Sequence, residues 1–110
     1  SVESRNVFTV TVRKTDADYS AFFEHRARKY VMETLPKVNI LEAVYLLPMV
    51  GGDIDGYYKI TRLTIEDGKM CLKLGEFISL GNQWVNIFQN MRHGELITMN
   101  NVLNLYGQRY

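Results

Sequence analysis

The spacing of apolar residues changes within the first third of the chain. Between residues 6 and 14 apolar and polar positions alternate, so that Phe8, Val10 and Val12 share one face. A period of two that is rich in β-branched residues predicts a half-buried strand. After this strand, apolar residues recur at steps of three and four. That spacing predicts one long amphipathic helix over residues 16–34.

Local signals support both ends of this predicted helix. Thr15 and Asp18 have the spacing of a capping box, in which side chains bind free amides of the first helical turn. Pro36 restricts the residue before it and ends the helix near Thr34. The apolar face of the helix comprises Tyr19, Phe22, Phe23, Ala27, Tyr30 and Val31.

Residues 39–47 fit two alternatives. Asn39 followed by Glu42 is typical of a capped helix over residues 40–47. The same run is short and apolar and is followed by Pro48, as expected of a buried strand. We favour the strand.

The strongest β signal is in the centre of the chain. Two runs, 57–65 and 70–80, are rich in β-branched, aromatic and aliphatic residues, and Asp67-Gly68 lies between them. Asp-Gly is favoured in two-residue turns because both central positions have positive φ. The sequence therefore predicts a central β-hairpin with strands 57–65 and 70–80.

The predicted turn determines which hairpin residues lie opposite one another. Arg62 falls opposite Lys73, and Tyr58 opposite Phe77, on the face expected to point away from the core. Two cations in a cross-strand pair repel each other, and an anion bound between them would relieve the repulsion. Cations beside flat rings are typical of surfaces that bind single-stranded nucleic acids. The alternative is that both cations extend into water and both rings pack under a helix.

The C-terminal third predicts short elements. Apolar spacing favours a helix over residues 83–92, and Thr98 is placed to cap another, with a strand over residues 96–99 before it. The fold class is therefore α+β, with a mixed or antiparallel sheet, the central hairpin, the helix 16–34 and one or two short C-terminal helices. Residues 1–110 have the length of a single domain, either a whole protein or a part excised from a longer chain.

Composition limits the function classes. The chain has 13 Lys+Arg and 12 Asp+Glu, a formal net charge of +1, which argues against a protein that binds by bulk positive charge. Cys71 is the one cysteine, so an intrachain disulfide is impossible and a reducing, cytoplasmic location is expected. No apolar run reaches the length of about 18 residues that a membrane helix needs, so no membrane partner is expected.

A second basic patch is expected on the predicted helix. Arg28 and Lys29 lie away from its aromatic face and are placed to contact phosphates. The simpler interpretation is a solvated face in which Glu24 and Arg28 form an i,i+4 pair.

Catalytic chemistry has little support in the sequence. Asp53, Asp67 and Lys69 have the spacing of a metal-dependent nuclease motif, but the second acid falls in the predicted turn instead of a strand. Neither His25 nor His93 has a partner at metal-ligand spacing. We therefore expect no catalytic residue, no metal and no cofactor.

These observations favour a non-enzymatic binding module associated with DNA or RNA. The expected nucleic-acid-binding residues are Tyr58, Arg62, Lys73, Phe77, Arg28 and Lys29. The alternative is a protein-interaction or inhibitor domain, acting as a homodimer or within a larger assembly, because seven tyrosines exceed what a small core can hide. A metal-dependent nuclease is a remote alternative.

Overall fold

The computed structural model describes residues 4–84 and 91–107. The chain is built mainly from strands. In chain order the elements are β1 (Asn6–Val12), α1 (Tyr19–Phe23), β2 (Lys29–Val31), the 3-10 turn η2 (Ile40–Glu42), β3 (Tyr45–Val50), β4 (Ile54–Glu66), β5 (Lys69–Trp84), β6 (Leu96–Thr98) and α2 (Met99–Gly107).

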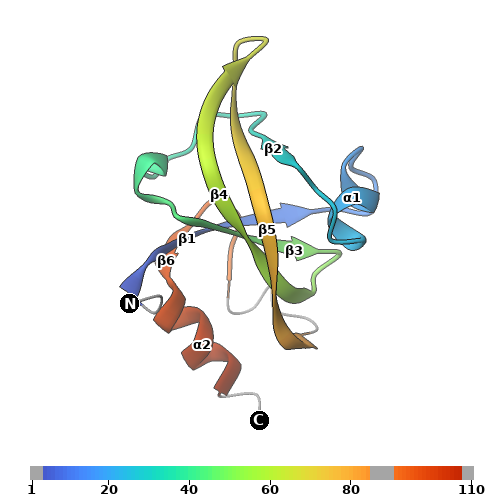
Figure 1. Cartoon of the computed structure of the whole chain (residues 1–110), viewed down its shortest axis with the longest axis vertical. Helices are drawn as coiled ribbons and strands as arrows, with labels where there is room; N and C mark the ends of the chain where they lie inside the picture. The colour runs from blue at the N-terminus through green and yellow to red at the C-terminus, as the bar shows by residue number, and fades with distance from the viewer. Residues whose placement is uncertain (1–3, 85–90, 108–110) are drawn as a thin grey trace.

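All six strands belong to one mixed sheet in the order β2-β5-β4-β3-β1-β6. β1 and β3 are parallel, and the other neighbouring pairs are antiparallel. Figure 1 shows the long β4 and β5 strands running along the molecule, with α2 at the end away from their connecting turn.

The predicted hairpin is confirmed, and its strands are longer than expected. Asp67 and Gly68 form the turn with φ angles of 52° and 75°. Near the turn, Ile65 pairs with Met70 and Leu63 with Leu72, as the sequence predicts. Farther along, the register shifts on both sides of Ile60, which indicates a bulged, irregular stretch.

The prediction of one long helix over residues 16–34 is wrong. Only Tyr19–Phe23 is α-helical, and Asp18 at its N-terminus makes no side-chain capping bond. The chain leaves the helix through His25, whose φ is 58°. Residues Lys29–Val31 form strand β2 on the edge of β5. The domain is therefore a sheet protein with short helices instead of one organised around a long helix.

Tertiary pairing explains this difference. Aromatic residues at steps of three and four suit a helix, but Tyr30 and its neighbours are equally suited to a strand. As a strand, Lys29–Val31 covers one edge of β5 with backbone hydrogen bonds, which a helix cannot do. Of the aromatic face predicted for the helix, Phe22 still packs edge-on against Tyr30, now from a separate element.

The C-terminal predictions have mixed outcomes. Strand β6 and helix α2 confirm the last two elements, and Asn101 N donates to Thr98 Oγ1 at 3.2 Å as expected of a helix cap. The helix predicted over residues 83–92 is wrong at its start, because β5 continues to Trp84. The rest of that prediction lies largely outside the described residues.

Residues 39–47 contain parts of both alternatives. Asn39 accepts a bond from Leu41 N and caps η2, while the strand begins later, at Tyr45. The turn therefore takes the residues with capping chemistry, and β3 takes the apolar residues that follow.

Two apolar clusters cover the two faces of the sheet. The Phe8 cluster includes Phe22, Leu46, Tyr58 and Leu72. The Met99 cluster contains the buried face of α2 and residues of the opposite strand faces, and comprises Val7, Tyr45, Leu47, Met49, Ile54, Tyr57, Met91, Met99 and Val102. β1 contributes to both clusters, so it is buried on both faces and not half-buried as predicted. Within the described residues, no helix has the length and apolar character needed to cross a membrane.

Candidate functional site

Three cations form a line across three neighbouring strands. Arg62 on β4 pairs with Lys73 on β5, as the sequence predicts, and Lys73 pairs with Lys29 on β2. Directly paired residues point to the same side of a sheet. Arg62, Lys73 and Lys29 therefore form one surface feature, which we call the cation row.

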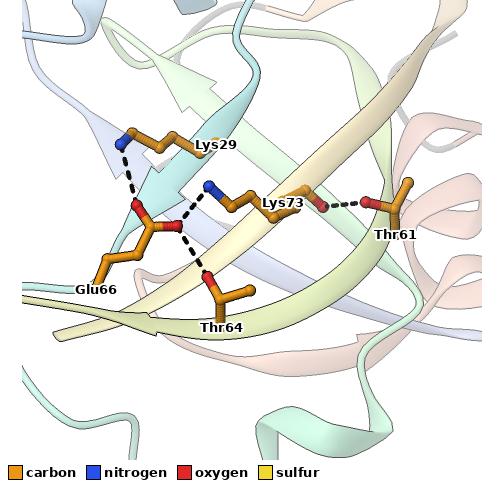
Figure 2. A network of polar contacts seen from close by, with 5 residues as sticks. All are labelled: Lys29, Thr61, Thr64, Glu66 and Lys73. Atoms are coloured by element: carbon orange, nitrogen blue, oxygen red, sulfur yellow. Dashed lines mark hydrogen bonds and ion pairs between the residues drawn. The ribbon is translucent and has the colours of Figure 1, made fainter.

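A carboxylate from the same hairpin neutralises part of the cation row (Figure 2). Glu66 Oε2 lies 2.5 Å from Lys73 Nζ, and Glu66 Oε1 lies 3.3 Å from Lys29 Nζ. Thr64 also donates to Glu66 Oε2, at 3.1 Å. The Lys73 and Thr64 hydrogen bonds, with that of Lys29, lower the pKa of Glu66 to about 2. The anion that the repelling cations require is thus supplied by the protein itself.

The network also explains the burial of the lone cysteine. Cys71 pairs with Thr64 on one side and Val31 on the other, in the line between the cation row and Glu66. The ion pairs from Lys29 and Lys73 to Glu66 pass over the paired residues Val31, Cys71 and Thr64, and Cys71 is 0% exposed. The thiol is therefore a packed residue beneath the ion pairs.

Arg62 differs from its two neighbours in the cation row. It is exposed, and it makes no ion pair with any residue of the described segments. A further pair, Lys69 Nζ to Glu33 Oε2 at 2.7 Å, lies beside Glu66 near the hairpin turn. Four cations and two carboxylates thus share this surface and leave it positive.

The two aromatic residues expected beside the cations do not share their surface. Tyr58 is 1% exposed and belongs to the Phe8 cluster, so its predicted place on an exposed face is wrong. The register shifts around Ile60 reverse the alternation, so Tyr58 and Arg62 lie on opposite faces of β4. A simple hairpin without a bulge would have placed them together.

Phe77 pairs with Tyr58 as predicted, but its ring is covered. His25 stacks on it with ring centroids 4.0 Å apart and an angle of 8° between the planes. On another side, a Cβ at Gly56 would lie 2.3 Å from Phe77 Cζ, which requires glycine there. Neither ring of the pair is therefore open to a stacking base.

Arg28 is also separated from Lys29. The Arg28 carbonyl accepts from Leu74 N at 2.9 Å, so the extended pairing of β2 with β5 already includes this residue. Consecutive residues of an extended chain point to opposite faces. Arg28 and Lys29 therefore do not form the common basic face that a helix would have given them.

A second candidate site is a cavity between the two edges of the curled sheet. It has a volume of about 460 Å³. Its walls include Tyr30 from edge strand β2, Phe8 and Thr11 from β1 beside the other edge, and His93. We call it the edge pocket. The complete lining is Phe8, Thr11, Arg13, Asp16, Tyr30, Met32, Glu33, Thr34, Leu35, Pro36, Lys37, His93 and Gly94.

Hydrogen bonds to the buried Thr9 place the exposed His93 at the rim of this pocket. Thr9 is 0% exposed, and its hydroxyl donates to Arg92 O at 2.5 Å and accepts from Glu95 N at 3.0 Å. Gly94 N donates to Thr9 O at 2.7 Å. These bonds hold the segment on both sides of His93 against β1.

The edge pocket has no signal in the sequence. His93 stands alone along the chain, and Asp16 falls within a pattern that predicts only a helix start. The pocket forms because β2 and the 93–94 turn approach β1 from different edges of the sheet. No local spacing of residues indicates that approach.

The metal-nuclease residues are not arranged as that motif requires. Asp67 lies in the hairpin turn, and Lys69 is paired with Glu33. In the segments that the structure describes, no group of three or more His, Cys, Asp or Glu side chains could hold a metal ion.

Comparison with known proteins adds no assignment to either site. No family model, no curated protein and no solved structure matches the chain.

Proposed function

We propose that the chain is a non-enzymatic binding module that contacts nucleic-acid phosphates through the cation row. The main observation in support is the alignment of Arg62, Lys73 and Lys29 across three strands. Such a line of cations suits a polyanion, whose phosphates repeat along one direction. Because Tyr58 and Phe77 are covered, the proposal includes no base stacking, and binding is expected to be largely independent of sequence.

Arg62 is the residue on which this proposal depends most. Lys73 and Lys29 are shared with Glu66, whereas Arg62 is exposed and unpaired within the described segments. Its guanidinium has the planar donor arrangement that binds phosphate oxygens in pairs. A phosphate at Arg62 could then also draw on the Lys73 charge opposite it.

The test is a fluorescence anisotropy titration of labelled single-stranded oligonucleotides at about 50 and about 200 mM salt. Wild type is expected to lose affinity as salt rises. Arg62→Glu is expected to weaken binding at low salt and to reduce the slope of log affinity against log salt by about 0.7 for each phosphate that the variant no longer neutralises. Arg5→Glu makes the same substitution at an exposed residue outside both the cation row and the edge pocket, and is the matched control. No binding at low salt, or equal losses of affinity in both variants, would contradict the proposal.

Exposed apolar side chains support self-association as a second candidate function. Phe23, Leu35, Leu41 and Ile65 are 59%, 79%, 78% and 66% exposed. Burial of these side chains against a second copy of the chain would remove apolar surface from water and favour association. Light scattering over a range of concentrations tests this candidate, and a monomer at every concentration would remove it.

A further inference from the structure

Three side chains around the edge pocket have polar atoms that the rest of the described chain leaves unused. Asp16 Oδ2 accepts from Arg13 N at 2.8 Å, and its second oxygen has no such bond. His93 Nδ1 accepts from Thr11 N at 2.8 Å, which leaves Nε2. The Tyr30 hydroxyl has no hydrogen bond within the described segments, although its ring packs against Phe22. These atoms are available to a ligand.

The bond to Thr11 determines what His93 offers. A nitrogen that accepts a hydrogen bond carries no proton, so neutral His93 has its proton on Nε2. The bond accepted at Nδ1 requires an unprotonated nitrogen there, and burial, then the charge of Arg13, lower the pKa of His93 against an opposing effect of Asp16. His93 therefore presents one N–H donor.

Tyr30 and Asp16 complete the set. Burial raises the pKa of Tyr30 to about 12, and the charges of Asp18, Asp16 and Glu33 add to the effect, so its hydroxyl keeps its proton. Asp16, Tyr30 and His93 all line the edge pocket, so together they offer one carboxylate acceptor and two donors.

The remaining lining favours an uncharged ligand with an apolar face. Leu35 is 79% exposed and Pro36 is partly exposed, so they offer the pocket apolar surface. Phe8 and Met32, at 3% and 5% exposure, only close its base. Around the opening, Arg13 and Lys37 balance Asp16 and Glu33 in formal charge. The volume lies within the range of about 300–1,000 Å³ that is usual for small-molecule sites.

We propose that the edge pocket binds a small, planar, uncharged heterocycle that carries a hydrogen-bond donor beside an acceptor. Nucleosides have this chemistry on their base edges. The ring would lie against Leu35 and Pro36, its donor would bind the Asp16 carboxylate, and its acceptor would receive the His93 N–H or the Tyr30 O–H. This site is separate from the cation row and does not depend on the proposed function.

The experiment is an NMR titration of the ¹⁵N-labelled chain with adenosine, guanosine, cytidine and uridine, each added separately. Ribose and inorganic phosphate are the controls for sugar and anion binding. At least one nucleoside is expected to shift the amides of Thr11 and Gly94 in a saturable way. No shift with any nucleoside, or equal shifts with ribose or phosphate, would overturn the proposal.

Variants test which atoms bind the nucleoside. Asp16→Asn is expected to weaken binding by about 10-fold or more, because the variant has no charged acceptor. Tyr30→Phe is expected to weaken it by about 3- to 10-fold, and the substitution removes no hydrogen bond of the described chain. Asp67→Asn makes the same substitution in the exposed hairpin turn, outside the pocket lining, and is expected to bind the nucleoside as wild type does. Wild-type affinity in both pocket variants, or an equally weakened Asp67→Asn, would overturn the assignment.

Discussion

The cation row and the edge pocket hold their polar groups in opposite ways. In the row, Lys73 and Lys29 are already bound to Glu66 across the sheet surface. In the pocket, the Tyr30 hydroxyl and one Asp16 oxygen have no partner in the described chain, although Tyr30 is partly buried. Surface charges that satisfy one another contribute little to specificity. A partly buried group without a partner, here the Tyr30 hydroxyl, favours a ligand that supplies one, and the exposed Asp16 carboxylate lies in the same lining. The row is suited to weak contact with a polyanion, and the pocket to selection of a small molecule.

The largest expected difference between the two regions is in how much their hydrogen bonds contribute to the free energy of unfolding. Thr9→Val removes three hydrogen bonds of a buried hydroxyl, to Arg92 O, Glu95 O and Glu95 N, which hold the segment around His93. We expect the free energy of unfolding to fall by about 1–3 kcal/mol. The measurement is urea denaturation followed by circular dichroism.

Thr61→Val is the matched control for this substitution on the hairpin. The Thr61 hydroxyl donates to Lys73 O at 3.2 Å, but Thr61 is exposed. The free energy of unfolding of Thr61→Val is expected to stay within about 0.5 kcal/mol of the wild-type value. Equal destabilisation by the two variants would contradict the difference between the buried pocket support and the exposed row.

The next expected effect is on the pH dependence of stability. The pKa of Tyr30 is raised to about 12, mainly by burial, whereas an unfolded chain titrates near 10. Because the folded value is the higher one, the contribution of Tyr30 is full below pH 10 and is lost as the pH rises through 12. Stability measured from pH 9 to pH 12 is expected to fall less in Tyr30→Phe than in wild type. Identical slopes would show that the Tyr30 hydroxyl is not in the environment described.

The smallest expected effect concerns Glu66 in the cation row. Its bonds to Lys73, Thr64 and Lys29 lower its pKa to about 2, so they stabilise the fold above the ordinary pKa of 4.5 and are lost as the pH falls through 2. An NMR titration of the carboxyl carbon is expected to give a midpoint near 2. Glu66→Gln is also expected to strengthen oligonucleotide binding a few-fold, because it frees both lysines. A midpoint near 4.5 or weaker oligonucleotide binding would count against the network.

The hairpin was predictable because its signals are local. Asp67-Gly68 determines the turn, and the turn determines that Arg62 faces Lys73. The position of Tyr58 was not predictable in the same way. It depends on a bulge around Ile60, where Gly75 on the partner strand leaves room for the Thr61 side chain, which would lie 2.9 Å from a Cβ there.

The segment between β1 and β3 shows why strand β2 and the edge pocket could not be predicted from the sequence. Its spacing favours a helix, yet Lys29–Val31 pairs with β5, an element about forty residues later in the chain. Local pattern carries no information on such a partner. The edge pocket has the same origin, because Tyr30 and His93 line one pocket only when the sheet edges approach each other.

The most direct test of the distinction between the two sites is one NMR sample titrated in turn with a nucleoside and with a single-stranded oligonucleotide that lacks bases, a poly(deoxyribose phosphate). The expected result is two separate sets of shifted amides. The nucleoside moves Thr11 and Gly94, and the abasic polyanion moves Arg62 and Lys73. A single common set of shifts, or shifts of the cation row by the nucleoside, would contradict that distinction.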